Sequence, residues 1–390
     1  MGGCLRSGRR PRPNETWRPG VRGKALFVGG VIVVVAGCGG HGRPVGSEDG
    51  LRHTTVRVAV GECGEGWREP EGGRQVFDLE NTSGAAAEVD LVDARTGAVY
   101  GEVEGLGPGT ERALRVTLGD GAYAFKCLPD DADAVTGPTV RISGSGVRSG
   151  PAALPVTQQD LIPPTLAYQR WIQARTVELA EKTDVLAADV DRGDLAAARA
   201  DWLPAHLVYE RMGAAYGTFG DADEAINGDA TGFHRVEQGL WHGESAASLR
   251  APADRLDAAV HALQKSWPDE RMDPADVGLR AHEIMENAVQ FELTGRTDHG
   301  SGTNLATTRA NLDGTRQLLT FLRPLLKTRD AGLTALDAAM NRAQHTLDTV
   351  DTKPLAQLTR AQREKVDADV GALVERLADV ATLTDVRRTA

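Results

Sequence analysis

The hydrophobic pattern of this 390-residue chain changes its period once, near residue 150, and this change constrains the fold more than any other feature. Between residues 54 and 144, apolar and polar side chains alternate in short runs such as 54–60 and 75–79. Alternation of this kind is typical of half-buried β-strands. From residue 157 onward, apolar side chains recur every three or four positions, which indicates amphipathic helices.

The predicted fold class is multidomain, with an N-terminal β-sandwich followed by an all-α helical bundle. About seven short strands separated by glycine- and proline-rich turns are expected at residues 54–144, which is typical of a small sandwich. A linker is expected at residues 145–156. Eight helices and no strand are expected at residues 157–390, and such helices bury their apolar stripes against one another.

Residues 1–37 have the pattern of a bacterial lipoprotein signal peptide. Seven basic residues precede an apolar run of 13 residues, which is too short to span a bilayer as a helix. The run ends in small residues directly before Cys38. We expect export, lipid modification of Cys38, and a Gly-rich tether at residues 38–53 that holds the protein at the outer face of the cytoplasmic membrane, in the periplasmic or cell-envelope space. An ordinary signal peptide followed by a chance cysteine is the alternative.

The charge of the mature chain excludes one class of partner. Removal of residues 1–37 would take away seven basic and one acidic residue and leave 37 basic and 54 acidic residues, a net charge of −17. Nucleic-acid binding needs a basic face, so we expect no nucleic acid as a partner.

Two cysteines, Cys63 and Cys127, remain within the predicted β domain. In an oxidising compartment such a pair predicts a disulfide. A thiolate pair that binds copper is the alternative.

Three histidines in the helical region precede a glutamate by three or four residues, so that each pair lies on one helix face. The pairs are His206 with Glu210, His234 with Glu237, and His282 with Glu286. Further acidic residues lie close in sequence: Asp221, Asp223 and Asp229 before His234, and Glu292 after Glu286. Mixed carboxylate and imidazole ligands suit iron, manganese or zinc. Surface ion pairs or hydrogen-bonded core histidines are the alternative interpretation of each pair.

The same residues do not form a recognised hydrolase motif. His282-Glu283 begins like the His-Glu-x-x-His sequence of zinc peptidases, but residue 286 is Glu. The inverse motif, a Gly-x-Ser-x-Gly elbow and a phosphate-binding loop are also absent from the sequence. The pattern therefore indicates metal binding without indicating catalysis.

The segment Gly232-Phe233-His234-Arg235-Val236-Glu237 resembles the Gly-x-His-x-x-Glu motif of the imelysin family, in the form found in its EfeO-type members. The resemblance covers residues 155–390 closely and continues through residues 205–210, 281–288, 298–307 and 310–316. EfeO-type proteins carry an N-terminal cupredoxin-like domain, which residues 54–144 resemble. Cys63 and Cys127 fall where that domain has its two cysteines, and Glu102 or Glu104 where it has acidic residues. Because this β region lacks the Cys-His-Met set of blue-copper sites, the resemblance favours a structural disulfide.

The resemblance implies the extracytoplasmic, iron-binding component of an EfeUOB-type ferrous iron importer, with a membrane permease and a haem peroxidase as partners. Iron, ferrous or ferric, is the expected metal, and copper and zinc are less favoured. His234 and Glu237 would be the core ligands. The further candidates are Glu210, Asp221, Glu286, His206, Asp223 and His282. Histidine ligation predicts that metal affinity falls below about pH 6.5.

Two other functions stay open at this point. The first is an enzyme, either an imelysin-like metallopeptidase or a ferroxidase, although no zinc-peptidase motif supports it. The second is a polysaccharide-binding or adhesion module built on the same bundle.

Overall fold

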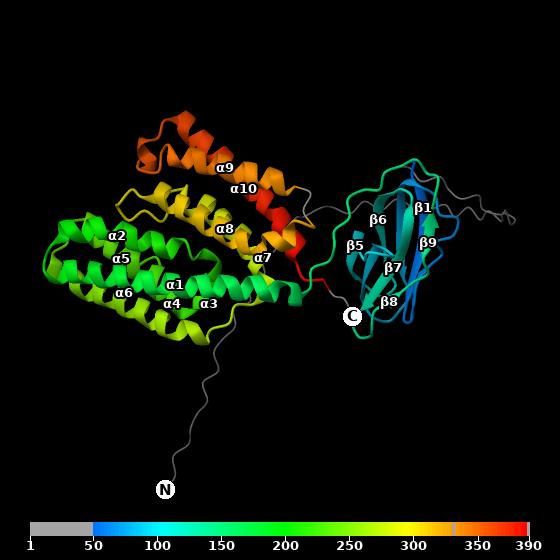
Figure 1. Cartoon of the computed structure of the whole chain (residues 1–390), viewed down its shortest axis with the longest axis horizontal. Helices are drawn as coiled ribbons and strands as arrows, with labels where there is room; N and C mark the ends of the chain where they lie inside the picture. Colours follow the sequence, from blue (N-terminus) through cyan, green and yellow to red (C-terminus); the bar gives the residue numbers. More distant parts are fainter. Residues whose placement is uncertain (1–49, 330–331, 388–390) are drawn as a thin grey trace, which may run out of the picture. The chain divides into compact units, whose positions relative to one another are not determined.

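The computed structural model describes residues 50–329 and 332–387 (Figure 1). The expected signal peptide, Cys38 and most of the tether lie outside these residues. Among the described helices, none combines the length and apolar character needed to cross a membrane.

Residues 52–142 form two β-sheets, which confirms the predicted sandwich. The first sheet has the order β2-β1-β3-β6 and the second β5-β4-β7-β8, with β9 also paired to β7. β1 and β3 are parallel, and the other pairs are antiparallel. The strands are β1 (Arg52–Ala59), β2 (Glu62–Glu65), β3 (Gly73–Asn81), β4 (Ala87–Asp93), β5 (Val99–Leu106), β6 (Glu111–Leu118), β7 (Gly121–Pro129), β8 (Val135–Thr136) and β9 (Val140–Ile142).

The described region thus has nine strands where about seven were expected. The two strands that the sequence pattern missed are β2 and β8, which have four and two residues. Segments this short have too few positions to show an alternating pattern.

A disulfide joins the two sheets. Cys63 on β2 and Cys127 on β7 are bonded, with their Cα atoms 5.8 Å apart. Both side chains are buried in the sandwich core, where Trp67, Phe77 and Phe125 pack edge to face.

The helical region contains ten described α-helices, which confirms the predicted all-α domain. They are α1 (Gln158–Asp191), α2 (Leu195–Glu210), α3 (Tyr216–Phe219), α4 (Asp221–Asn227), α5 (Gly232–Trp241), α6 (Ala246–Ser266), α7 (Val277–Asn287), α8 (Asn304–Leu326), α9 (Leu333–Asp348) and α10 (Arg360–Thr384). The eight longer helices correspond to the eight that were expected. The additional α3 and α4 have four and seven residues and lie in the acidic segment before α5.

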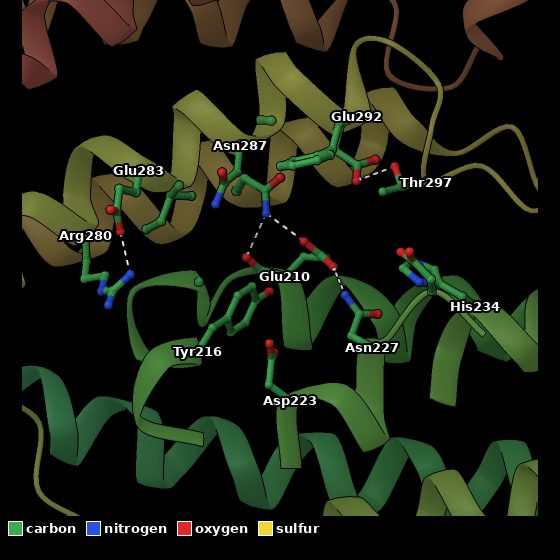
Figure 2. Close-up of a pocket in the computed structure, with 16 residues that line it drawn as sticks. Glu210, Tyr216, Asp223, Asn227, His234, Arg280, Glu283, Asn287, Glu292 and Thr297 are labelled. Atoms are coloured by element: carbon green, nitrogen blue, oxygen red, sulfur yellow. Dashed lines mark hydrogen bonds and ion pairs between the residues drawn. The ribbon is translucent and has the colours of Figure 1, made fainter. Parts of the chain in front are cut away.

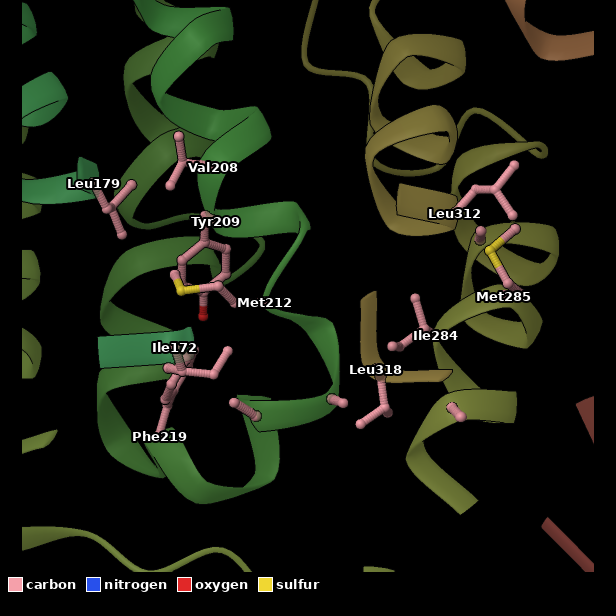
Figure 3. Packing of buried hydrophobic residues seen from close by; sticks show 14 of the residues in the cluster. Ile172, Leu179, Val208, Tyr209, Met212, Phe219, Ile284, Met285, Leu312 and Leu318 are labelled. Atoms are coloured by element: carbon pink, nitrogen blue, oxygen red, sulfur yellow. The ribbon is translucent and has the colours of Figure 1, made fainter. Parts of the chain in front are cut away.

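Apolar side chains from several helices fill one continuous core (Figure 3). Ile172 and Leu179 come from α1, Val208 from α2, Met285 from α7 and Leu312 from α8, and all five are buried.

The end of α2 and the middle of α8 approach closely at Gly314, where an added Cβ would lie 2.3 Å from the Arg211 carbonyl oxygen. This approach brings α8 against Glu210, the last residue of α2.

The disulfide is expected to stabilise the sandwich by about 4 kcal/mol, because it closes a loop across 64 residues of the unfolded chain. In a Cys63→Ser, Cys127→Ser variant, hydrogen exchange measured by mass spectrometry should become faster in peptides of β3, β4 and β7. Peptides from α1 and α8 serve as the internal control and should exchange as before. Unchanged protection of the β7 peptides would contradict this prediction.

Candidate metal centre

A single glycine determines how α5 enters the bundle. Gly232, the first residue of α5, has φ of +50°, a conformation that side-chain-bearing residues rarely adopt. A Cβ at this position would lie 1.8 Å from the Ile226 carbonyl oxygen in α4. The glycine therefore lets the start of α5 pack against the end of α4, and α5 carries His234 and Glu237 into the interior, where they are 5% and 1% exposed.

The His206–Glu210 pair on α2 forms a buried ion pair. His206 Nε2 lies 3.0 Å from Glu210 Oε1. The Glu210 carboxylate also accepts hydrogen bonds from Asn227 Nδ2 at 2.9 Å and Asn311 Nδ2 at 2.8 Å. Burial opposes ionisation of Glu210, but the charge and hydrogen bond of His206 and the bond from Asn311 outweigh it and lower its pKa. Burial likewise opposes the charge on His206, whose pKa is nevertheless raised by Glu210.

Glu210 also lines a cavity of about 350 Å³ between several helices (Figure 2). In Figure 2, Glu210 lies between Arg280 and His234, which occupy opposite sides of the view. The carboxylate, guanidinium and imidazole side chains that line the cavity are Glu210, Asp223, Asp229, His234, Arg280, Glu283 and Glu292. Oxygen ligands therefore predominate, with an imidazole from α5.

The His234 ring is oriented as a metal-binding imidazole needs to be. Its Nδ1 atom lies 3.2 Å from the Gly228 carbonyl oxygen. A carbonyl oxygen only accepts, so Nδ1 carries the proton and Nε2 keeps its lone pair. A backbone carbonyl in this role is a common partner of histidine ligands. Burial and the neighbouring His206 lower the pKa of His234 to about 4, so the ring is neutral at physiological pH.

Glu292 enters the same cavity from a π-helical turn. α7 continues directly into a π-helix over Ala288–Glu292. Thr297 Oγ1 donates to Glu292 Oε1 at 2.6 Å, and Asn304 Nδ2 donates to Glu292 Oε2 at 2.9 Å. Burial and the nearby charge of Glu210 raise the pKa of Glu292 to about 7. Single π turns occur frequently at functional sites.

Asp223 on α4 supplies another carboxylate to the cavity and accepts a hydrogen bond from the Tyr209 hydroxyl. Burial raises its pKa. Asp221, at the start of α4, is exposed and does not line the cavity.

Glu237 is buried beside the cavity but does not line it. Its Oε1 atom accepts hydrogen bonds from the backbone amides of His299 at 3.2 Å and Ser301 at 2.9 Å. Burial raises its pKa. In this arrangement Glu237 joins α5 to the loop that precedes α8.

The third sequence pair lies away from the cavity lining. His282 Nδ1 and Glu286 Oε2 on α7 are 3.6 Å apart, and their side chains are 19% and 42% exposed. Glu286 also accepts a hydrogen bond from Gln290. The pair has the features of a helix-surface interaction.

Among the residues that line the cavity, the sequence selected Glu210, Asp223 and His234 as candidates. Its candidate set did not include the lining residues Asn227, Asp229, Glu283, Glu292 and Asn311. Asn227 and Asn311 carry no metal-binding pattern and are identified only by their contacts with Glu210. Glu292 lies six residues after Glu286, which on a regular helix places it about 240° around the axis. His299 lies in a loop, with its ring 4.8 Å from that of His234.

The arrangement can bind a hard or borderline cation through carboxylate oxygens and imidazole nitrogen. His206 Nδ1 is buried and has no hydrogen-bond partner among the described residues, so it would offer a further nitrogen to a cation once the ring has lost its Nδ1 proton. The cavity ligands are not among the described groups whose ligand atoms all lie within 4.8 Å of one another. Binding therefore requires side-chain movement toward the ion.

Comparisons with known proteins relate the helical domain to one family. The family model described as Imelysin, or Peptidase M75, matches residues 165–382, a region that includes every residue lining the cavity. The iron uptake system component EfeO of Escherichia coli K12 is 26% identical over 325 residues, which cover 79% of this chain and 85% of that protein. EfeO proteins of Escherichia coli O157:H7 and Shigella flexneri show the same identity and coverage.

Gly232→Ala should destabilise the protein by more than the ~1–3 kcal/mol that backbone strain alone would cost, because the added methyl group also overlaps the Ile226 carbonyl oxygen. Gly243→Ala is the matched control, since Gly243 has φ of +79° but nothing within 4 Å of its added Cβ. Urea unfolding compares the two free energies, and metal titration should show weaker binding only in Gly232→Ala. Equal effects of the two substitutions would contradict the close-packing argument.

Proposed function

We propose that this chain, which belongs to the imelysin family, is the extracytoplasmic, lipid-anchored iron-binding component of an EfeUOB-type ferrous iron uptake system. The observation that carries the proposal is the carboxylate-rich cavity of the helical domain, with one neutral imidazole, in a chain similar to EfeO. Iron is the cargo in this proposal and would leave the site again.

The chemistry of the cavity suits reversible iron binding. Glu210 stays ionised because His206 and Asn311 stabilise its charge. His234 presents an unprotonated Nε2, and Asp229 lines the cavity while remaining exposed to solvent. The cavity ligands must move toward the ion when it binds. The free energy needed for this movement lowers the affinity, which keeps the ion exchangeable.

Delivery to a membrane permease and cooperation with a haem peroxidase form the second part of the proposal. They are supported by the similarity to proteins named as components of an iron uptake system. Anchoring through lipid-modified Cys38 would keep the carrier beside such a permease, and a cupredoxin-like role of the β-sandwich belongs to the same proposal.

A metallopeptidase or ferroxidase is the alternative, since the family model carries a peptidase name. A peptidase needs a free carboxylate as general base beside the metal-bound water. Glu237, the glutamate of the Gly-x-His-x-x-Glu motif, instead has its Oε1 atom engaged by two backbone amides. This engagement favours a structural role for Glu237 and a binding function for the site.

The proposal predicts that a Glu210→Gln, His234→Gln double variant binds ferrous iron at least about 100-fold more weakly, because two cavity ligands are lost. His282→Gln, Glu286→Gln is the matched control, with the same residue types removed from the surface of α7. Anaerobic isothermal titration of the mature protein, with circular dichroism to verify folding, measures both affinities. Equal affinity in the cavity variant and the control would refute the proposed site.

Iron affinity is also predicted to fall as pH decreases through about 7, by up to tenfold per pH unit. Glu292 must lose its proton to bind a cation, and its pKa of about 7 lies well above that of an ordinary carboxyl. His234 does not cause this decrease, because its pKa of about 4 keeps it neutral, in contrast to the value near 6.5 assumed from the sequence. Titrations of Glu292→Gln from pH 6 to 8 should show a flattened dependence, whereas Glu286→Gln should retain it.

A further inference from the structure

We propose that α1 and α6 together form a second, separate site for a divalent cation, composed of Asp184, Asp257 and His261. The ligand class is a divalent first-row metal ion such as Zn²⁺, Fe²⁺ or Mn²⁺, bound by one imidazole nitrogen and two carboxylate oxygens. None of these three residues lines the cavity of the candidate metal centre.

The site arises from two helices that pack along each other. Asp257 and His261 are four residues apart on α6, so their side chains lie on one face of that helix. Asp184 comes from α1 and meets the same imidazole. The spacing within α6 is visible in the sequence, whereas the partner from α1 appears only when the helices pack.

The distances agree with those in a metal site. His261 Nε2 lies 3.0 Å from Asp184 Oδ1 and 3.8 Å from Asp257 Oδ1. All three residues offer ligand atoms within 4.8 Å of one another. Ligand atoms bound at about 2.1 Å around a tetrahedral ion are about 3.4 Å apart, so the two observed distances lie on either side of the required value.

The surroundings orient the ligands and leave them accessible. Thr183 Oγ1 on α1 donates to Asp257 Oδ1 at 2.8 Å, which fixes the carboxylate that is least exposed. The Asp184, Asp257 and His261 side chains are 56%, 23% and 44% exposed. A cation from solvent can therefore reach the group and complete its coordination with water.

The electrostatics of the group favour a cation at the imidazole. The hydrogen bond that His261 donates to Asp184 and the charge of Asp257 raise the pKa of His261 despite partial burial. The two carboxylates thus favour a positive charge at this position, whether a proton or a metal ion carries it. A divalent ion would replace the Nε2 proton, which passes to solvent, and would join α1 to α6.

The test uses Zn²⁺ and the mature full-length protein. Equilibrium dialysis should show about one ion fewer per chain in His261→Gln than in wild type. Asp184→Asn, on the other helix, should give the same loss. The matched control is His345→Gln, which removes an exposed histidine from α9 and should bind as wild type does. The rise in Tm caused by Zn²⁺ should be smaller in the first two variants.

Two further measurements separate this site from the cavity and from nonspecific binding. In the Glu210→Gln, His234→Gln background, His261→Gln should still remove one ion. Calorimetry at pH 6 in two buffers of different ionisation enthalpy should detect release of up to one proton per ion, and this release should disappear in His261→Gln. Equal Zn²⁺ stoichiometry in His261→Gln, Asp184→Asn and His345→Gln would overturn the proposal.

Discussion

The buried carboxylate of Glu210 is the interaction on which the helical domain and its cavity depend. Its hydrogen bonds come from three places in the sequence: His206 one turn earlier in α2, Asn227 at the end of α4, and Asn311 on α8. An ionised carboxylate inside a protein is costly unless such partners compensate for the lost water. The same bonds that satisfy the charge therefore also determine where α2, α4 and α8 meet, and the cavity forms at that junction.

The change in hydrophobic period was enough to predict the two structural classes, because alternation and helical periodicity depend on local sequence alone. The candidate site was only partly predictable, because it depends on contacts between segments that are distant in the sequence. Spacing determines which face of a helix a His–Glu pair occupies, but not what that face contacts. His206–Glu210 and His282–Glu286 share their spacing, yet the first pair is buried and Glu210 lines the cavity, whereas the second lies away from it.

Residues whose role depends on tertiary contacts could not be found from the sequence. Asn227 and Asn311 matter because a packed helix brings them to Glu210, and Gly314 permits that approach on α8. Glu292 departs from the regular helical pattern because a π turn intervenes. The short strands β2 and β8 are likewise recognised through their pairing partners, β1 and β7.

The loop between the π turn and α8 has a mechanical consequence for the cavity. Its backbone amides at His299 and Ser301 hold Glu237 of α5, and its Thr297 side chain holds Glu292. His234 and Glu292 thus lie on two sides of the cavity that are both hydrogen-bonded to the same short loop. If the Glu292 carboxylate shifted toward an ion, its hydrogen bond with Thr297 would move this loop, and the loop would in turn move α5, which carries His234. The two sides of the cavity would then move toward the ion, and away from it, together.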